Sequence, residues 1–316
     1  MKKIAFIFPG QGSQSVGMGK DLYDNSAAAR KVLETADSVL ENKISDICFN
    51  GPEEALKQTI NTQPTILAVS IAALEAFKEK CSVNPDFLAG HSLGEYAALY
   101  ASEVLDLESV MKIISKRAEL MNKAATSTTG TMAAILGLNQ EKVEETINSL
   151  ETQGIVSVAN YNSPEQVVIT GEVDAVNTAM EAIKSAGAKR VLPLPVSGAF
   201  HSALMKDASV EFASFIKNFD IQDGSIPVVT NTDAKITTNS VEFKEKMPTQ
   251  IYSSVYWTQT IQNLINEGVD TFIEMGPGKV LAGLNKKIDS NVTTYNIYDT
   301  ASLDATVEAL KTAQAI

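Results

Sequence analysis

The sequence predicts an α/β fold, in which the parallel central sheet of one large domain is interrupted by a smaller βαββαβ unit. An apolar run at residues 3–8 ends in a glycine-rich loop, as a buried strand of a parallel sheet often does. A G-x-S-x-G motif at residues 90–94 joins a predicted strand to a helix-like stretch. Between residues 131 and 194, short strands and helices follow one another in the order βαββαβ.

Composition places the chain among globular proteins that bury a substantial core. It has 316 residues, of which 44% are hydrophobic, and a net charge of −12. Nucleic acid and anionic membranes require a dominant basic face, so neither is expected as the main partner. Cys48 and Cys81 have no metal-type spacing, which argues against zinc and indicates a reducing compartment. Because no apolar run is long enough for a signal peptide or a membrane span, we expect a cytoplasmic protein.

The first part of the chain is predicted to alternate strands with helices. Its glycine-rich loop at 9–14 carries neither phosphate-binding motif, because Ser15 replaces the third dinucleotide glycine and Met18 replaces the Walker lysine. Pro64 is expected to open a long apolar helix. The predicted elements are a strand at 3–8, helices at 27–40, 53–58 and 65–79, a strand at 85–89, and helices at 95–101 and 107–125.

Residues 127–197 are predicted to form an inserted small domain, and residues 1–126 and 198–316 together form the large domain. The order of the six short elements is the split βαβ order that is typical of ferredoxin-like domains. These elements are strands at 131–137, 155–160, 166–171 and 189–194, and helices at 140–150 and 173–185.

Beyond the insertion the chain returns to the α/β pattern. His201 is expected at the opening of a helix that runs to about residue 219. A second glycine-rich loop at 276–278 follows a strand, but it too lacks the Walker spacing. The other predicted elements are strands at 227–230 and 271–275 and helices at 257–268 and 279–288.

Ser92, at the centre of the G-x-S-x-G motif, is the predicted nucleophile. A serine at the tip of a tight strand-to-helix turn exposes its hydroxyl, and the backbone N–H groups that follow it face any oxyanion formed there. A glycine-rich turn with a solvated serine would show the same local pattern. The choice between these interpretations depends on a general base elsewhere in the chain.

His201 is the predicted general base. The chain has two histidines, and the other, His91, adjoins Ser92 in the turn. The side chain of His91 should therefore project away from the serine hydroxyl, and we expect a packing role for it. A histidine at a helix start is usually structural, but His201 is the base that remains for Ser92. No Asp or Glu stands in a motif that marks it as the third member, and a backbone carbonyl or an amide could also serve.

Arg117 falls on the apolar face of the helix predicted at 107–125. Arginine is rarely buried without an acidic partner. A structural ion pair, or a side chain whose charged head reaches water, would explain this placement. The functional alternative is a bidentate clamp for a carboxylate on the substrate. The apolar face is traced at steps of three or four residues by Leu107, Val110, Ile114 and Met121.

Seven segments form a set that spans nearly the whole chain: Phe8-Pro-Gly-Gln-Gly-Ser13, Gly90-His-Ser-Leu-Gly-Glu95, Arg117, Asn160-Tyr-Asn-Ser-Pro164, Gly198-Ala-Phe-His201, Gln250 and Glu274-Met-Gly-Pro-Gly278. Each segment alone is a weak signal. Taken together and in this order, they resemble the malonyl-CoA:acyl-carrier-protein transacylases, an acyltransferase family of fatty-acid and polyketide synthesis. The resemblance implies that the large domain is α/β-hydrolase-like and that the small domain is ferredoxin-like.

The resemblance also implies catalytic roles for the matched residues. Ser92 would be the acyl-accepting nucleophile and His201 its base. The backbone carbonyl of Gln250 would orient the imidazole, which would supply the missing third member. The backbone N–H groups of Gln11 and Leu93 would form the oxyanion hole.

Four residues are expected to bind the substrate. Arg117 would hold the malonyl carboxylate, and Asn160 and Met121 would also line the substrate site. Phe200 resembles the bulky residue that leaves no room for a branched methylmalonyl group in malonyl-selecting relatives, although it could simply be a core aromatic. Excluding one methyl group contributes only about 1–3 kcal/mol, so the expected preference is incomplete.

The resemblance implies a ping-pong reaction that moves malonyl from malonyl-CoA to the phosphopantetheine thiol of acyl carrier protein, through a malonyl-Ser92 ester. No metal or redox cofactor is expected. A polyketide carrier protein, a serine thioesterase and an inactive scaffold that docks carrier protein are the alternatives. The chain is expected to act as a monomer. Carrier protein is acidic in this family, so docking is expected on local basic pairs, with candidates Lys189, Arg190, Lys286 and Lys287.

Overall fold

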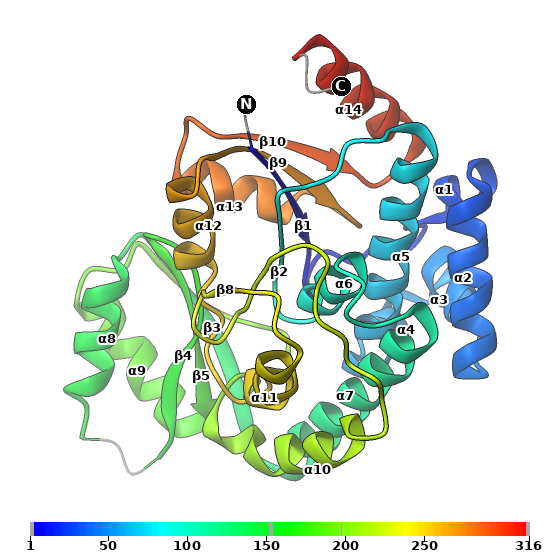
Figure 1. Cartoon of the computed structure of the whole chain (residues 1–316). Helices are drawn as coiled ribbons and strands as arrows, with labels where there is room; N and C mark the ends of the chain where they lie inside the picture. The colour runs from blue at the N-terminus through cyan, green and yellow to red at the C-terminus, as the bar shows by residue number, and fades with distance from the viewer. Residues whose placement is uncertain (1–2, 152–153, 197, 314–316) are drawn as a thin grey trace.

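The computed structural model describes residues 3–151, 154–196 and 198–313. These residues form a six-stranded sheet and a four-stranded sheet, each with helices packed against it (Figure 1). The predicted α/β class, with a parallel central sheet and a small inserted sheet, is confirmed. Of the helices in the described ranges, none combines the length and apolar content that a membrane span requires.

The larger sheet has the strand order β10-β9-β1-β2-β7-β8 and is parallel except for β8, which pairs antiparallel with β7. Strand β1, which is buried from Ile4 to Phe8, lies between β2 and β9. Because parallel strands end at the same edge, the loops after β1, β2, β7 and β9 gather there, as in other open α/β sheets. The strands are β1 (Lys3–Phe8), β2 (Phe87–Gly90), β7 (Val228–Val229), β8 (Ile236–Thr237), β9 (Val269–Met275) and β10 (Thr293–Ile297).

Helices cover both faces of this sheet, and the alternation of side chains along β1 shows how the two cores form. Phe6 and Phe8 point into the core beneath α2, α5, α6 and α7, whereas Ala5 and Ile7 point into the core beneath α12 and α13. The helices are α1 (Lys20–Asn25), α2 (Ala27–Leu40), α3 (Ile44–Asn50), α4 (Glu53–Leu56), α5 (Thr59–Lys80), α6 (Gly94–Ala101), α7 (Leu107–Ser127), α10 (Lys206–Ile216), α11 (Ser240–Gln250), α12 (Trp257–Asn266), α13 (Val280–Ile288) and α14 (Thr300–Thr312).

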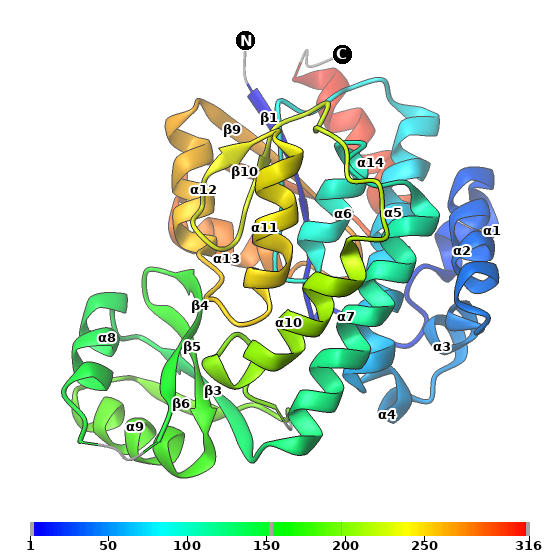
Figure 2. The same cartoon turned by 60° about the horizontal axis from the view of Figure 1, so that its bottom comes forward.

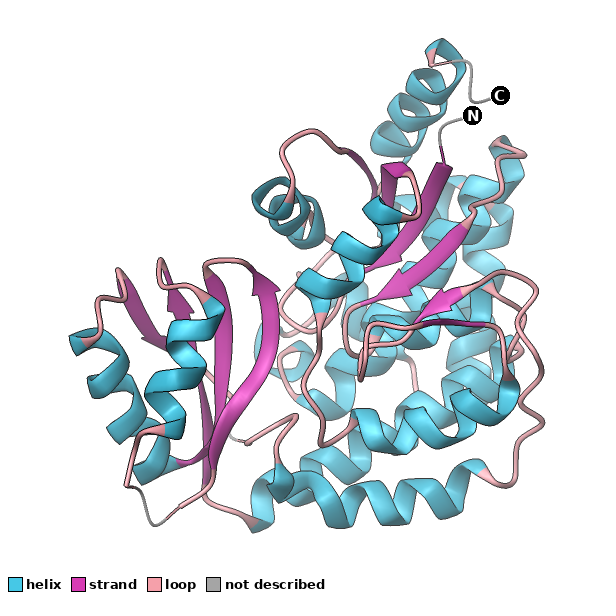
Figure 3. Cartoon of the chain, turned by 60° about the vertical axis from the view of Figure 1, so that its left-hand side comes forward, coloured by secondary structure: helices cyan, strands magenta, loops and turns pink. Residues whose placement is uncertain are grey.

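The smaller sheet is antiparallel and has the order β4-β5-β3-β6, which is the strand order of a ferredoxin-like domain. Its chain order, β3-α8-β4-β5-α9-β6, confirms the predicted βαββαβ arrangement. Helices α8 and α9 lie on its outer face, away from the larger sheet (Figure 3). The elements are β3 (Gly130–Leu136), α8 (Gln140–Asn148), β4 (Val156–Ser163), β5 (Gln166–Glu172), α9 (Val173–Ser185) and β6 (Arg190–Pro193).

The two sheets are joined through the edge of β4. The N–H of Tyr161 donates to the carbonyl of Val255 at 2.9 Å, and the N–H of Val255 donates to the carbonyl of Ala159 at 2.8 Å. Helix α10 lies beside α7 where the chain returns to the larger sheet (Figure 2). The division into 1–126 with 198–316 and 127–197 stays a prediction, and its boundary residue 197 is outside the described residues.

Two predicted helix starts were wrong. Helix α5 begins at Thr59, and Pro64 lies within its second turn instead of opening it. The preference of proline for a first turn is overridden here because α5 is buried on all sides, and the Thr65 hydroxyl donates to the carbonyl of Asn61. No helix begins at His201, whose φ of 58° is left-handed and cannot start one. A short 3₁₀ turn, η1 (Ala203–Met205), and then α10 follow it.

The contact between β1 and α6 depends on Gly94. An added Cβ there would lie 2.2 Å from the carbonyl oxygen of Phe8, which is backbone and cannot move aside easily. Gly283, inside α13, has no heavy atom within 4 Å of the same hypothetical Cβ. The first glycine is therefore required by packing, and the second is not.

We expect Gly94→Ala to lower the free energy of unfolding by about 2–3 kcal/mol, because the new methyl group overpacks a backbone contact. Gly283→Ala is the matched control and should raise that free energy by up to about 1 kcal/mol through helix propensity. Urea denaturation of both variants measures the difference. Equal stabilities for the two variants would contradict the packing argument.

Candidate active site

Ser92 lies in the turn between β2 and α6, with a left-handed backbone φ of 52°. This strained turn carries the serine hydroxyl to the carboxyl edge of the larger sheet. The N–H groups of Leu93 and Gln11 line the same cavity. Neither N–H has a hydrogen-bond partner within the described part of the chain, so both can donate to a ligand.

His201 reaches Ser92 from the turn before α10. Its Nε2 lies 2.8 Å from Ser92 Oγ, and its Nδ1 lies 2.9 Å from the carbonyl oxygen of Gln250 and 3.0 Å from that of Ser253. Two carbonyl acceptors at Nδ1 require that this nitrogen carries the proton. The unprotonated Nε2 therefore accepts the hydrogen bond of the serine hydroxyl.

Burial and, as the second cause, the positive charge of Arg117 together lower the pKa of His201 to about 3. The imidazole is therefore neutral at physiological pH, which is the state that can accept a proton. No carboxylate stands behind it, because both contacts at Nδ1 are backbone carbonyls. The residues described here thus form a serine–histidine pair supported by peptide groups.

Arg117 projects from α7 into the protein interior, where it is 1% exposed. Its Nη1 donates to Gln63 Oε1 at 2.5 Å, and its Nη2 donates to Gln250 Oε1 at 2.9 Å and to Ser92 Oγ at 3.1 Å. Its Nε has no partner among the described residues. The guanidinium also lies over the ring of Tyr96, 5.5 Å from the centroid.

The acidic partner that a structural role for Arg117 would need is not found within the described ranges. All three hydrogen-bond acceptors of its guanidinium are neutral. Glu95 is buried nearby and attracts the charge, but burial raises the pKa of Glu95 to about 7, and the pair forms no salt bridge. The side chain does not reach water either. A buried positive charge therefore stands beside the serine hydroxyl with capacity for an anionic ligand.

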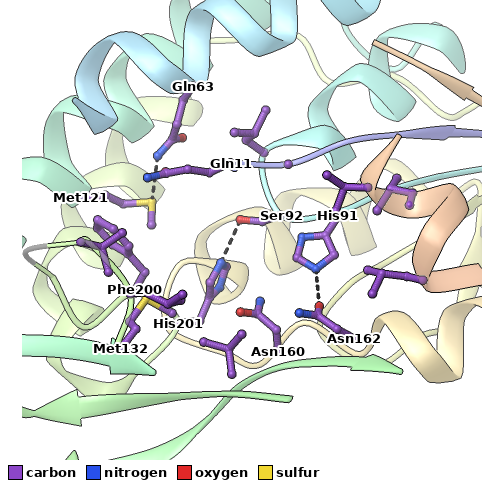
Figure 4. A pocket seen from close by; sticks show the side chains of 18 of the residues that line it. Gln11, Gln63, His91, Ser92, Met121, Met132, Asn160, Asn162, Phe200 and His201 are labelled. Atoms are coloured by element: carbon purple, nitrogen blue, oxygen red, sulfur yellow. Dashed lines mark hydrogen bonds between the residues drawn. The ribbon is translucent and has the colours of Figure 1, made fainter. Parts of the chain in front are cut away.

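A cavity of about 190 Å³ opens over Ser92 (Figure 4). The smaller sheet forms one wall of this cavity. Side chains along its strands point alternately toward α8 and α9 and away from them, and those that point away, such as Met132 and Val168, line the cavity. The larger domain supplies the facing wall. Of the predicted site residues, those lining the cavity are Gln11, Ser92, Leu93, Arg117, Met121, Asn160, Phe200 and His201.

Gln250 lies behind these residues and not in the cavity wall. It supports three of them: its carbonyl accepts from His201, its Oε1 accepts from Arg117, and its Nε2 donates to the carbonyl of Ser92 at 3.0 Å. The basic candidates Lys189, Arg190, Lys286 and Lys287 do not line the cavity either. Lys287 comes nearest through its hydrogen bond to Gln166, which does line it.

His91 does not contact the serine hydroxyl. Its Nε2 lies 2.8 Å from Asn162 Oδ1 (Figure 4). Its ring packs against Trp257, with the ring centroids 5.6 Å apart. The ring also borders the cavity. Sequence reasoning did not identify Gln63, Met132 and Asn162 as cavity residues, because a neutral side chain in a buried helix or strand carries no local signal for a site.

Glu274 sets the position of a further part of the wall. Its carboxylate accepts from the N–H groups of Leu281 and Ala282 at 3.0 and 2.9 Å, and so caps the start of α13. Leu281 and Leu284 of that helix line the cavity. The Gly276–Gly278 loop therefore serves helix placement. Within the described ranges, no three His, Cys, Asp or Glu side chains are grouped to hold a metal ion.

Comparisons with known proteins agree on one family. Residues 5–313 match the family described as "Acyl transferase domain". The chain is 45% identical over 312 residues to a malonyl CoA-acyl carrier protein transacylase of Bacillus subtilis (strain 168), covering 98% of each chain. It superposes with a TM-score of 0.93 and 42% identity on an acyl carrier protein S-malonyltransferase from Vibrio cholerae O1 biovar eltor, covering 96% of this chain and 100% of the other.

A second solved structure contains a partner. It is a malonyl-transacylase in complex with its type II PKS acyl-carrier protein, with a TM-score of 0.94 and 39% identity. The match covers 98% of this chain and all of that chain. The similarity therefore extends over the whole architecture, including both sheets.

We expect the imidazole of His201 to stay neutral between about pH 5 and 8, and its NMR resonances to show no titration there. Arg117→Ala removes one of the causes that lower the pKa of His201, so it should raise this pKa while burial keeps it below about 6.5. Titration of ¹³C-labelled histidine measures both values. Lys116→Ala changes the residue that precedes Arg117 in α7 and is the control. The pKa of His201 in this variant should equal the wild-type value. A wild-type pKa near 6.5 would refute the prediction.

Proposed function

We propose, from the premise that this chain belongs to the acyl transferase family, that it moves a malonyl group from malonyl-CoA to acyl carrier protein. One observation carries the proposal. Ser92 Oγ lies between a neutral general base, His201, and a buried guanidinium, Arg117, that forms no salt bridge with a described residue. Such a site combines a nucleophile with a receptor for an acyl group that bears its own carboxylate.

In the first half-reaction, His201 Nε2 takes the proton of the Ser92 hydroxyl while Oγ attacks the malonyl thioester carbon. The N–H groups of Gln11 and Leu93 donate hydrogen bonds to the oxyanion of the tetrahedral intermediate. When this collapses, the C–S bond breaks, and the departing sulfur of coenzyme A takes the proton from His201. A malonyl-Ser92 ester remains.

In the second half-reaction, the phosphopantetheine thiol of the carrier enters the same cavity. His201 accepts the thiol proton, the sulfur attacks the ester carbon, and the C–O bond to Ser92 breaks. The proton returns to Ser92 Oγ through His201. The reaction is a ping-pong transfer between two thiols. His201 carries the protons, and the N–H groups of Gln11 and Leu93 stabilise the oxyanion.

Binding of the malonyl carboxylate also changes the pKa of the general base, His201. In the free protein the charge of Arg117 helps to hold the pKa of His201 far below its ordinary value. A carboxylate paired with that guanidinium cancels the charge, so the pKa of His201 rises when malonyl binds. Proton transfer from Ser92 therefore becomes easier with a carboxylated acyl group than with an acetyl group.

The walls of the cavity favour a short, unbranched acyl group. Phe200 is 7% exposed and borders the cavity near Met121 and Met132 (Figure 4). We assign to Phe200 the exclusion of a branched methyl group, with a discrimination of about 1–3 kcal/mol. Asn160 supplies an amide to the cavity from strand β4 of the smaller sheet.

The basic pairs are proposed to guide the acidic carrier. Lys287 donates to Gln166 at 2.9 Å, and Lys189 lies 3.9 Å from Glu165, so both reach the turn between β4 and β5 at the rim of the cavity. Two exposed apolar side chains lie in the same elements as basic candidates: Leu192 is in β6 with Arg190, and Val280 is in α13 with Lys286 and Lys287. A positive rim with apolar contacts offsets the overall charge of −12 during docking.

The carrier is proposed to belong to fatty-acid elongation. The complex of a similar transacylase with a type II PKS carrier favours a polyketide carrier as the second candidate. We further propose that the enzyme works as a cytoplasmic monomer with no metal or redox cofactor, because one chain supplies the nucleophile, the base, the oxyanion donors and the anion clamp.

Intact mass after mixing with malonyl-CoA should show a malonyl adduct on the wild-type protein and none on Ser92→Ala. Arg117→Ala should lower the rate of adduct formation about 100-fold with malonyl-CoA, because a charge-assisted pair is lost, and much less with acetyl-CoA. Methylmalonyl-CoA should react more slowly than malonyl-CoA, by about 10–100-fold.

Lys116→Ala controls for changes in α7 and should react at the wild-type rate. Equal losses with malonyl-CoA and acetyl-CoA in Arg117→Ala would exclude the clamp. An adduct that water removes as fast as it forms would indicate a thioesterase instead. Absence of any adduct on the wild-type protein would indicate an inactive scaffold.

The double charge reversal Lys189→Glu with Lys287→Glu should raise KM for carrier protein about tenfold or more at low salt, with a smaller effect at high salt. Steady-state transfer at several salt concentrations gives this value, and adduct formation from malonyl-CoA alone separates docking from the first half-reaction. Lys43→Glu with Lys217→Glu is the control of equal charge, since neither side chain bonds to the turn between β4 and β5 as Lys287 and Lys189 do. If both double variants change KM equally, net charge and not the rim would govern docking.

A further inference from the structure

Asn231 makes two hydrogen bonds to the turn that carries Ser92. Its Oδ1 accepts from the N–H of Ser92 at 2.7 Å, and its Nδ2 donates to the carbonyl of Gly90 at 2.7 Å. The side chain is fully buried and is not part of the cavity wall. It therefore acts on the backbone of the nucleophile and not on a ligand.

Strand register brings Asn231 to this position. Strands β2 and β7 are parallel, with Ala89 opposite Val229. Continuing that register by two residues puts Asn231 beside His91, in the middle of the turn. The contact spans 139 residues of sequence and depends on the sheet, so the sequence alone carries no sign of it.

The remaining backbone groups of the turn have partners in the sheet and in α6. The N–H of His91 donates to Phe8, and the carbonyl of His91 accepts from Gly94. The carbonyl of Ser92 accepts from Glu95 and from the Gln250 side chain. Asn231 pairs the two groups that neither element reaches, which leaves the N–H of Leu93 unpaired among the described residues.

A side-chain amide suits this role because its oxygen accepts from one backbone group while its nitrogen donates to another. Asn231 is itself held in place. Its N–H donates to Glu95 Oε2 at 2.7 Å, and its carbonyl accepts from the N–H of Tyr256 at 3.0 Å. Glu95 lies in the first turn of α6, so the turn, the helix and Asn231 form a closed hydrogen-bonded ring.

We propose that Asn231 is a positioning residue for acyl transfer, which holds Ser92 in its left-handed conformation and leaves the N–H of Leu93 aimed at the reacting carbonyl. The inference rests on the proposed function for the meaning of these groups. Loss of the amide frees the peptide group between His91 and Ser92 to rotate, because a left-handed serine is strained without support. The reacting oxygen and the oxyanion donor then lose alignment together.

Asn231→Ala should lower the rate of malonyl-Ser92 formation about 100-fold with KM changed less than threefold, because the substrate contacts remain. The matched control is Ser102→Ala. Ser102 is fully buried, and its Oγ donates to the carbonyl of Ile226 and accepts from its N–H, so it too bridges backbone groups. Ser102 follows the C-terminal end of α6, about 12 Å from the Ser92 turn at the other end of this helix. The rate of malonyl-Ser92 formation in Ser102→Ala should therefore stay within about threefold of the wild-type rate.

Asn231→Asp provides the second test and covers the case in which Asn231→Ala does not fold. Its carboxylate can accept from Ser92 but cannot donate to Gly90 until it is protonated. The ratio of the variant rate to the wild-type rate should therefore rise as pH falls from about 8 to 5. A loss of general stability, as in Ser102→Ala, would give a ratio that does not depend on pH.

Two results would overturn the proposal: a rate for Asn231→Ala within threefold of that for Ser102→Ala, or a pH-independent ratio for Asn231→Asp. Labelling of Ser92 by a fluorophosphonate, followed in parallel, separates this inference from the proposed function. If wild-type protein reacts with the fluorophosphonate but forms no malonyl adduct, the proposed function fails, and a slowed labelling of Asn231→Ala still supports positioning. If labelling is equally fast in both proteins, positioning fails whatever the substrate is.

Discussion

The arrangement of this site follows from one constraint, the burial of the Arg117 guanidinium beside the serine hydroxyl. A cation removed from water without a counter-ion is costly, and here it is held by neutral oxygens from Gln63, Gln250 and Ser92. Its charge is solvated by dipoles that cannot neutralise it. In the proposed function, the carboxylate of the acyl group supplies the missing negative charge.

The same charge explains why His201 is oriented by the carbonyls of Gln250 and Ser253. A carboxylate in this position would lie close to the guanidinium, would compete with the substrate for it, and would raise the pKa of the imidazole in the free protein. Peptide carbonyls fix the tautomer without adding a charge. The orientation of His201 by neutral carbonyls and the lack of a salt bridge to Arg117 are therefore two consequences of one electrostatic arrangement.

The two sheets divide the remaining work. The larger sheet brings the ends of β1, β2, β7 and β9 to one edge, where peptide N–H groups and the strained Ser92 turn are placed by register. The smaller sheet contributes a wall through Met132 of β3 and Gln166 and Val168 of β5, while its other face is covered by α8 and α9. Chemistry is concentrated on loops of the rigid parallel sheet, and the fit of the acyl group depends on the contact between the sheets.

The sequence by itself determined the α/β class, the βαββαβ insertion and most strand and helix cores, because hydrophobic periodicity and glycine-rich turns are local signals. It also singled out Ser92, His201 and Arg117, through a turn motif, the scarcity of histidine and a charge on an apolar stripe. It misplaced the start of α5 and a helix at His201, where burial and a left-handed turn overrode local preference. The Gln250 carbonyl beside His201 was expected from the family resemblance, whereas only the tertiary structure revealed the second carbonyl, that of Ser253, and the hydrogen bonds of Asn231 to the Ser92 turn. Such contacts join neutral groups across long stretches of chain, and strand register, which no local pattern specifies, brings them together.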